Sequence, residues 1–290
     1  MFLGGARPFG LGLLAPPGIK TAERWKTAQY RYKIERKLGE GAYGRAYLVS
    51  DRDMLQPGVS KVAQDRESAA GFTAEAGALW KLIGLPGIPG LIESGKDYFV
   101  TEFVVGKSLD QIVFGRPKLA ISERLCLART IADIMSKVHE QGIVHADLKP
   151  ENILATDDGL VILDFGAAFE HGEAPYPPGE PLGTEPYMSP EQIMGAWEHV
   201  NEPTDVYALG VMIYEFLTGR LPFDPDKELP ELQQEVLTQP PIRPSSYARI
   251  PKKVDDLVCR MLAKDYARRP TMAQVKRALA QYAVKCPWLR

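Results

Sequence analysis

The chain has few cysteines, little net charge and no long apolar run, and each shortage argues against a class of protein. Three cysteines in 290 residues, with no Cys-x-x-Cys pair, predict neither a disulfide framework nor a zinc site and favour a reducing compartment. A net charge of −2 gives no electrostatic basis for nucleic-acid binding. The longest apolar stretch, Val206 to Leu217, contains Glu215 and is too short to span a membrane. We therefore expect a cytoplasmic globular protein without a membrane span.

The first 30 residues lack the pattern of a targeting signal. Residues 1–19 are apolar, but glycine and proline interrupt them, and the run from Leu11 to Ala15 is too short for a signal-peptide core. We expect residues 1–30 to form an extension that is flexible or that docks on another surface.

The most informative stretch is the polar string from His145 to Asn152, which Asp164-Phe165-Gly166 follows twelve residues after Asn152. Two short apolar runs lie between them, around the turn Thr156-Asp157-Asp158-Gly159, and predict a β-hairpin. Antiparallel pairing would bring the start of the first strand beside the end of the second. We therefore expect Asn152 to lie next to Asp164.

The residue types in this string suit phosphoryl transfer. Asp147 and Lys149 come just before the hairpin and supply a carboxylate and an ammonium group. Asn152 and Asp164 supply the oxygen ligands that Mg²⁺ prefers. Phosphoryl transfer needs a base for the hydroxyl proton, a cation beside the moving group and a bound metal ion.

The string resembles the catalytic loop and the metal loop of the protein kinases. The family pattern is His-Arg-Asp, an Asn five residues after the Asp, and then Asp-Phe-Gly; here only the Arg differs, and it is Ala146. The resemblance implies that Asp147 is the catalytic base, that Lys149 assists transfer, and that Asn152 and Asp164 bind the metal. The loop is similar to that of the serine/threonine kinases, which have a lysine at the position of Lys149. The resemblance implies that Lys149 contacts the substrate hydroxyl.

A glycine-rich loop lies between two strands expected within residues 31–50. Its spacing, Gly-x-Gly-x-x-Gly, also occurs in dinucleotide-binding proteins, but there a helix follows the loop, whereas here a strand continues. The strand-loop-strand form resembles the kinase loop that covers the ATP phosphates, except that Ala46 replaces the usual valine. The resemblance implies nucleotide contacts from Leu38, Gly39, Gly41, Gly44 and Ala46.

Two further residues resemble the kinase ion pair that orients ATP. Lys61 lies in a third strand, predicted over residues 59–63, and corresponds to the lysine on the α- and β-phosphates. A helix predicted over residues 67–82 contains its candidate partner, Glu75. Glu67 is the alternative, but we favour Glu75 because Leu79, one turn later, can pack on the same face.

Residues 100–106 resemble the linker between kinase lobes, which holds adenine through main-chain atoms. The resemblance implies that Glu102 and Val104 contact adenine and that Thr101 guards the back of the slot. A plain buried strand would have the same side chains, so this alternative stays open.

Residues 183–191 resemble the end of the kinase activation segment, and three structural roles follow from the resemblance. Glu191 would pair with Arg269. Asp205 would brace the catalytic-loop backbone, although a simple N-cap is an equal alternative. His145 would stack on Phe165 rather than act as a base.

The segment before that end contains no serine or threonine from Gly166 to Gly183, and Tyr176 is its only hydroxyl. In many relatives the arginine before the catalytic aspartate binds a phosphate on this segment. Ala146 cannot do so. We therefore expect activity that does not require phosphorylation of the segment.

Helical patterns dominate the second half of the chain. Apolar residues at helical spacing predict a helix over residues 122–141, with Ser122 as N-cap and Gly142 as stop. Residues 204–218 are apolar nearly all round, which predicts a buried central helix. Amphipathic patterns predict two more helices over residues 253–262 and 272–282.

These patterns predict an α+β chain that resembles the two-lobed protein kinase fold from about Tyr32 to Tyr282. A small β-rich lobe with one main helix would cover residues 31–103, and a larger helical lobe residues 104–290. The resemblance, closest to the bacterial relatives of eukaryotic kinases, implies ATP and Mg²⁺ as cofactors and proteins with Ser/Thr acceptors as substrates. A small-molecule phosphotransferase of related fold and a pseudokinase scaffold remain alternatives. The Pro-Glu segment end and the retained catalytic residues disfavour them.

Overall fold

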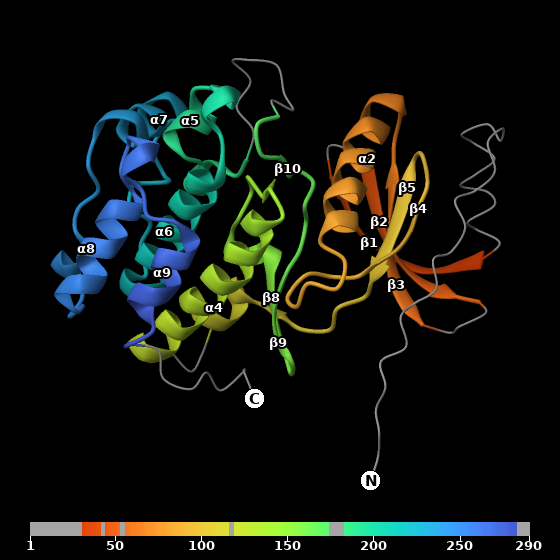
Figure 1. Ribbon diagram of the computed structural model, residues 1–290, viewed down its shortest axis with the longest axis horizontal. Helices are drawn as coiled ribbons and strands as arrows, with labels where there is room; N and C mark the ends of the chain where they lie inside the picture. The colour runs from red at the N-terminus through yellow and green to blue at the C-terminus, as the bar shows by residue number, and fades with distance from the viewer. Residues whose placement is uncertain (1–30, 42–43, 53–55, 116–118, 174–182, 283–290) are drawn as a thin grey trace, which may run out of the picture. The chain divides into compact units, whose positions relative to one another are not determined.

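A computed structural model describes residues 31–41, 44–52, 56–115, 119–173 and 183–282 (Figure 1). The chain divides into two compact units. The first unit contains the described residues up to Thr73 together with Leu91–Glu102, and the second contains Ala74–Gly90 and the chain from Phe103 onward. The predicted extension over residues 1–30 and Tyr176 of the activation segment lie outside the described residues.

The first unit is built on a five-stranded antiparallel sheet in the order β1-β2-β3-β5-β4 (Figure 1). Tyr32, Val49, Tyr98 and Val100 form a buried apolar cluster on this sheet. Phe72 of helix α2 lies with its ring 5.6 Å from that of Phe99, which attaches the first half of the helix to the sheet. Its strands are β1 (Tyr32–Gly41), β2 (Gly44–Asp51), β3 (Pro57–Ala63), β4 (Leu91–Ser94) and β5 (Tyr98–Glu102). Helix α2 (Arg66–Lys81) belongs to this unit up to Thr73 and to the second unit from Ala74.

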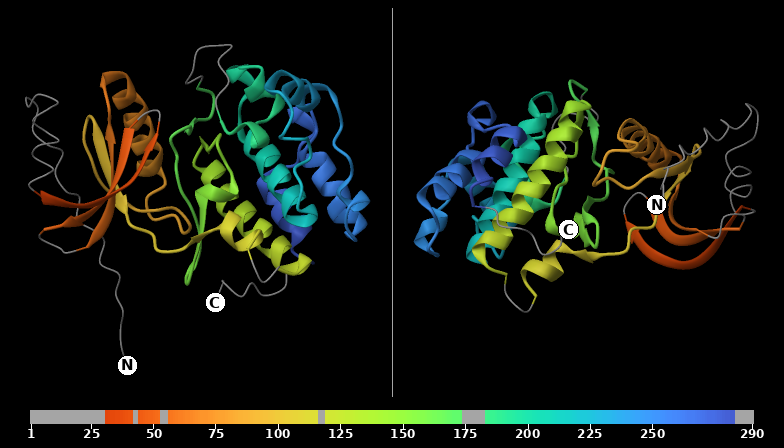
Figure 2. Two further views of the ribbon diagram at one scale, coloured as in Figure 1. Left: turned by 180° about the vertical axis from the view of Figure 1, so that it is seen from behind. Right: turned by 60° about the horizontal axis from the view of Figure 1, so that its bottom comes forward.

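The second unit is mainly helical. Its central helix α6 is buried along nearly its whole length, as an apolar sequence predicts, and it ends at Gly219, whose φ of 71° is left-handed. Helix α4 packs against α6 and α9, and the three lie side by side in both views of Figure 2. The helices are α3 (Leu109–Val113), α4 (Ile121–Glu140), α5 (Pro190–Ile193), α6 (Glu202–Thr218), α7 (Leu229–Thr238), α8 (Lys252–Met261) and α9 (Met272–Leu279).

Short strands and 3₁₀ turns in the second unit carry the candidate active site. Strands β6, β8 and β9 form one small sheet, and β7 pairs with β10 in another. The strands are β6 (Lys107–Ser108), β7 (Ile143–Val144), β8 (Ile153–Thr156), β9 (Gly159–Ile162) and β10 (Phe169–Glu170). The 3₁₀ turns are η1 (Pro150–Asn152), η2 (Glu185–Tyr187), η3 (Trp197–His199), η4 (Pro244–Ser246) and η5 (Tyr266–Arg268).

The predicted fold class is confirmed, because a β-rich region with one main helix precedes a helical region. The predicted N-cap of the helix near residue 122 is wrong. Helix α4 begins at Ile121 with Ala120 as N-cap, and Ser122 lies inside its first turn. The Glu123 carboxylate accepts a hydrogen bond from the Ala120 N–H at 2.7 Å, so a side chain further along stabilises this start. Helix α7 was not among the helices predicted from the sequence. It is amphipathic and buries Leu232 and Val236.

The cysteines require one correction, because Cys126 on α4 is disulfide-bonded. Sequence spacing does not report which distant cysteines meet in space, so this bond could not be predicted from the pattern. Cys259 is free, and Cys286 lies outside the described residues. Among the helices that the structure describes, none has both the length and the apolar character needed to cross a membrane.

Candidate active site

The predicted hairpin places Asn152 and Asp164 at one end of the site. Strands β8 and β9 pair from Ile153–Ile162 to Thr156–Gly159. Beyond the Ile153–Ile162 pair, at the open end of the hairpin, the Leu163 N–H donates to the Asn152 carbonyl at 2.7 Å. The residue after Leu163 is Asp164, so the expected neighbourhood of Asn152 and Asp164 is confirmed.

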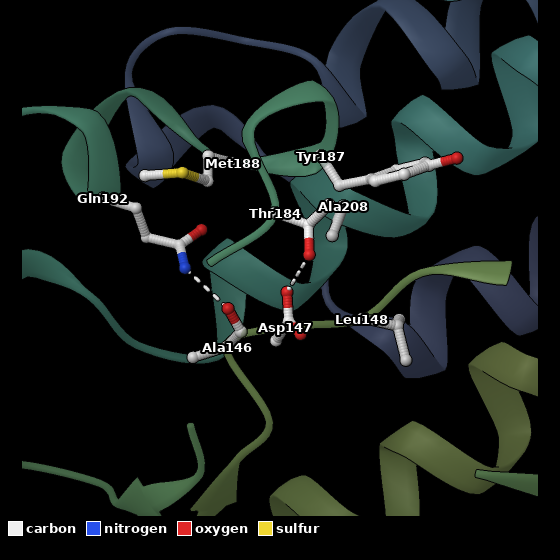
Figure 3. Close-up of a pocket in the computed structure, with 8 residues that line it drawn as sticks. All are labelled: Ala146, Asp147, Leu148, Thr184, Tyr187, Met188, Gln192 and Ala208. Atoms are coloured by element: carbon white, nitrogen blue, oxygen red, sulfur yellow. Dashed lines mark hydrogen bonds between the residues drawn. The ribbon is translucent and has the colours of Figure 1, made fainter. Parts of the chain in front are cut away.

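Asp147, Lys149 and Thr184 form a closed triangle of hydrogen bonds (Figure 3 shows the Thr184–Asp147 bond). Lys149 Nζ donates to Asp147 Oδ2 at 2.8 Å and to Thr184 Oγ1 at 2.5 Å. The Thr184 hydroxyl donates in turn to Asp147 Oδ1 at 2.8 Å. The Asp147 and Lys149 side chains keep 17% and 21% of their surface exposed, so a substrate can still reach the carboxylate.

Asn152 is oriented with its amide oxygen available to a cation. Its Nδ2 donates to the Asp147 carbonyl at 3.0 Å, and its Oδ1 accepts none of the hydrogen bonds found among the described residues. Asp164 lies close by, and a Cβ on Gly166 would be 3.3 Å from Asp164 Oδ1 and 3.6 Å from Glu75 Oε2. The carboxylates of Glu75 and Asp164 therefore lie on the same side of Gly166.

Two oxygen-donor residues fit a magnesium ion that is bound together with nucleotide phosphates. Mg²⁺ commonly takes one or two carboxylates from the protein and its other ligands from phosphate and water. The described residues contain no group of three or more His, Cys, Asp or Glu side chains arranged for a metal. Asn152 and Asp164 supply one amide oxygen and one carboxylate, a donor set that suits an ion with further ligands from phosphate and water.

His145 has the structural role that its sequence context predicted. Its side chain is fully buried, and its ring lies 4.7 Å from the Phe165 ring. The Asp147 N–H donates to His145 Nδ1 at 3.3 Å, so the ring proton is on Nε2 and donates to the Leu163 carbonyl at 3.0 Å. Both ring nitrogens are therefore occupied by main-chain groups, and neither is free to act as a base.

Asp205 braces the catalytic loop, and the alternative that it only caps a helix is wrong. Asn201 occupies the N-cap position of α6, and Asp205 lies in its first turn with no exposed surface. Asp205 Oδ1 accepts from the Ala146 N–H at 2.9 Å, and Oδ2 accepts from the His145 N–H at 3.0 Å and contacts His139 Nε2 at 2.8 Å. Burial alone raises the pKa of this carboxyl, but the bonds to His139 and to His145 outweigh burial and lower it.

Ala146 has a left-handed backbone, with φ of 60°. Ala146 and Asp164 are the two non-glycine residues with positive φ in the described chain, and both lie in this site. Such a conformation costs about 1–3 kcal/mol and persists where surrounding contacts hold it. The Ala146 methyl group is buried in an apolar group that we call the Trp197 cluster, made of Val144, Ala146, Ala167, Phe169, Trp197 and Val200.

The predicted pair between Glu191 and Arg269 is present and buried. Arg269 Nη1 and Nη2 donate to the two Glu191 carboxylate oxygens at 2.6 and 2.9 Å, and the side chains are 0% and 2% exposed. Arg269 also donates to the carbonyls of Ala263 and Pro203, and Thr204 Oγ1 donates to Glu191 at 2.8 Å. The pair fixes the end of the activation segment to the helical unit.

The nucleotide-binding residues predicted between Leu38 and Glu102 lie on the sheet of the first unit, whereas Val104 lies after β5, in the second unit. Lys61 on β3 stands opposite Ala46 on β2 and Phe99 on β5, and its Nζ lies 5.8 Å from the centre of the Phe99 ring. A Cβ on Gly44 would lie 2.4 Å from the Val62 carbonyl oxygen, so glycine is required there. The contacts expected from Leu38, Gly39, Gly41, Gly44, Ala46, Lys61, Thr101, Glu102 and Val104 stay predictions.

Three residues of the site were missed from the sequence. Gln192 is 1% exposed and donates from Nε2 to the Ala146 carbonyl at 2.6 Å (Figure 3). Trp197 fills the cluster around Ala146, with its ring 6.4 Å from that of Phe169. His139 contacts Asp205. Helical spacing signals which positions are buried, but the tertiary partner of a buried polar group has no local signal.

Comparison with known proteins agrees with this geometry. Residues 32–282 match the family model described as the protein kinase domain. The serine/threonine-protein kinase pkn3 of Myxococcus xanthus is 31% identical over 277 residues, which cover 88% of this chain and 50% of that protein. A probable serine/threonine-protein kinase, PknB, of Lactococcus lactis is 30% identical over 253 residues, covering 83% of this chain and 40% of that protein. The chain therefore spans about half or less of the length of these relatives.

Proposed function

Since the chain belongs to the protein kinase family, we propose that it transfers the γ-phosphoryl group of Mg²⁺-ATP to serine and threonine hydroxyls of proteins. The observation that carries this proposal is the triangle of Asp147, Lys149 and Thr184, which sets a carboxylate and an ammonium group 2.8 Å apart in a partly exposed position. Curated relatives with the same domain are named serine/threonine-protein kinases, which supports the choice of acceptor.

In the proposed reaction, Asp147 accepts the hydroxyl proton and Lys149 offsets the negative charge of the moving phosphoryl group. The acceptor hydroxyl oxygen forms a bond to the γ-phosphorus while the bond from that phosphorus to the β–γ bridging oxygen breaks, and ADP leaves. The hydroxyl proton passes to the Asp147 carboxylate. Lys149 donates to Asp147 Oδ2, so its ammonium group is beside the same carboxylate and can offset negative charge on the moving phosphoryl group.

Asn152 and Asp164 would hold Mg²⁺, which when bound neutralises charge on the phosphate oxygens. The Asn152 amide nitrogen is used in a bond to the Asp147 carbonyl, and this leaves its oxygen for the ion. Asp164 supplies the charged ligand. Glu75 and Lys61 would orient the α- and β-phosphates, and the main chain of Glu102 and Val104 would hold adenine beside Thr101. The glycine loop over residues 39–44, with Leu38 and Ala46, would cover the phosphates.

When the chain is incubated with γ-labelled ATP, Mg²⁺ and a generic protein substrate, we expect the substrate protein to become labelled. The label should be on phosphoserine and phosphothreonine, with little on phosphotyrosine. Omitting Mg²⁺ or adding a chelator should abolish labelling. A pseudokinase would label nothing. A small-molecule phosphotransferase would label an aminoglycoside or choline and leave the protein unlabelled. A dominant phosphotyrosine signal would overturn the assignment of the acceptor.

We further propose that activity does not require phosphorylation of the activation segment. The residue before Asp147 is Ala146, which has no charge with which to bind a segment phosphate. Its methyl group is buried in the Trp197 cluster, and Trp197 itself is 1% exposed. The side chain of residue 146 is therefore surrounded by apolar groups, and a phosphate would be poorly stabilised among them.

Contacts that involve no phosphate hold the described parts of the segment. Strand β10 pairs with β7, and the His171 N–H donates to the Gly142 carbonyl at 2.8 Å. Glu170 forms an ion pair with Lys81. At the other end of the segment, the Thr184 hydroxyl is bonded to both Asp147 and Lys149.

The test is to treat the purified protein with a phosphatase, confirm by mass spectrometry that residues 166–184 are unmodified, and measure the initial rate. We expect the rate to stay within about threefold of that before treatment, a change in the barrier of under about 1 kcal/mol. A fall of about tenfold or more, about 1.4 kcal/mol, that recovers on rephosphorylation of Tyr176 or Thr184 would contradict the proposal.

A further inference from the structure

The backbone of Ala146 is held on both sides by contacts from two helices. Ala146 has a left-handed backbone that alanine adopts unfavourably. Its N–H donates to Asp205 of α6 at 2.9 Å, and its carbonyl accepts from Gln192 of α5 at 2.6 Å. That carbonyl belongs to the peptide whose nitrogen is in Asp147. The contact from Gln192 therefore fixes the orientation of this peptide, and with it the direction in which the Asp147 side chain points.

The Gln192 amide can present only its nitrogen to Ala146. Its Oε1 accepts from the Ser189 N–H at 3.1 Å and from the Ser189 hydroxyl at 3.3 Å, which fixes the rotation of the amide group. The side chain is 1% exposed, so water does not replace either partner. Gln192 is thus a buried, fully bonded connector between the segment end and the catalytic loop.

Gly183 leaves room for this connector. Its φ is 133°, and a Cβ on it would lie 3.2 Å from Gln192 Nε2 and 3.5 Å from the Ala146 carbonyl oxygen. The next residue, Thr184, donates to Asp147 Oδ1. Figure 3 shows both bonds, one from Gln192 to Ala146 and one from Thr184 to Asp147, at neighbouring positions of the same loop.

We propose that Gln192 is a positioning residue for the base: it stabilises the left-handed conformation of Ala146 and thereby holds the Asp147 carboxylate toward the acceptor hydroxyl. The proposal rests on the proposed kinase function. Gln192 is buried and touches neither nucleotide nor acceptor. It acts on the reaction only through the backbone of residues 146 and 147.

The test compares Gln192→Met with Gln234→Met, the same substitution on an exposed position of α7. We expect Gln192→Met to lower kcat about 10–100-fold and to leave the KM for Mg²⁺-ATP within about twofold, because the base is misplaced and the nucleotide contacts are not. Gln234→Met should keep the wild-type kcat. Equal kcat values for the two variants would overturn the proposal.

A second substitution separates positioning from a merely structural role. Glycine adopts positive φ without the penalty of alanine. Ala146→Gly should therefore raise kcat about fivefold in the Gln192→Met background and give no gain in the wild-type background. If Gln192→Met only destabilised α5, a change at residue 146 would not restore kcat. The proposal is therefore overturned if Ala146→Gly changes kcat by the same factor with and without Gln192→Met.

Two controls keep the outcomes distinguishable. Circular dichroism and thermal unfolding show whether Gln192→Met is folded; if it is not, Gln192→Leu takes its place, because it also lacks the donor and introduces no buried charge. The same kcat loss and glycine rescue are expected of it. If the wild-type chain transfers no phosphoryl group to protein, the proposed function fails; if it does and Gln192→Met is unimpaired, only the present proposal fails.

Discussion

Asp147→Asn is expected to lower kcat by about 10²–10⁴-fold, the usual contribution of a general base, while the KM for Mg²⁺-ATP stays within about twofold. The amide has the same shape but cannot accept the hydroxyl proton at neutral pH. The Asp147 carboxylate contacts Lys149 and Thr184, and it lies 3.4 Å from Asn152 Nδ2, whose shorter bond, at 3.0 Å, is to the Asp147 main-chain carbonyl. The substitution therefore keeps the main contact that orients Asn152 and leaves Asp164 unchanged. Asp164→Asn should differ, because it removes a charged ligand and raises the KM for Mg²⁺-ATP as well.

The control is Asp157→Asn in the exposed turn between β8 and β9, which makes the same change of charge in the same unit. Initial rates are measured over a range of Mg²⁺-ATP concentrations for all three variants. Full activity of Asp147→Asn, or a loss matched by Asp157→Asn, is the result that contradicts the assignment of the base.

Arg269→Ala is expected to lower the free energy of unfolding by about 3–5 kcal/mol, because it leaves Glu191 as a buried and uncompensated charge. The two side chains are 0% and 2% exposed and joined by two hydrogen bonds. Arg269→Lys should also be costly, since a single ammonium group cannot make the two parallel bonds and the bonds to Ala263 and Pro203 together.

Arg268→Ala is the matched control, because Arg268 precedes Arg269, is 79% exposed and lies 3.9 Å from Asp265. An exposed pair of this kind contributes about 0–1 kcal/mol. Urea unfolding followed by circular dichroism measures all three variants. If Arg269→Ala proved no more destabilising than Arg268→Ala, the buried pair would not stabilise the segment end.

The parts of the fold that depend on local pattern could be predicted from the sequence. The hairpin over residues 153–162 follows from two apolar runs around a short turn, and its pairing alone brings Asn152 to Asp164. The burial of α6 follows from its apolar composition. The pairing of Glu191 with Arg269 came from the family resemblance, because residues so far apart in sequence carry no local signal for each other.

The parts that depend on tertiary partners could not be predicted. Gln192 reads as an ordinary polar residue of a short helix, and only the fold places its amide against the Ala146 carbonyl. Ser122 is a good N-cap residue by type, yet the helix starts one residue before it, where Glu123 supplies the acceptor for Ala120. Propensity ranks residue types at a position, but here the bond from Ala120 to Glu123, three residues along, accompanies a start that the rank of Ser122 did not indicate.

If activity is independent of segment phosphorylation, as proposed above, Ala146 and Trp197 have a consequence for any attempt to make this chain respond to a phosphate. Introducing arginine at 146 would look like a return to the common family pattern. Here it would force a long cationic side chain into the space that the Trp197 cluster fills, and we expect a damaged loop rather than a new sensor. An arginine at residue 146 would need a second substitution, at Trp197, that makes room for its side chain. A single substitution at residue 146 therefore cannot convert this chain into a phosphorylation-controlled one, and the indole at residue 197 is the second position to change.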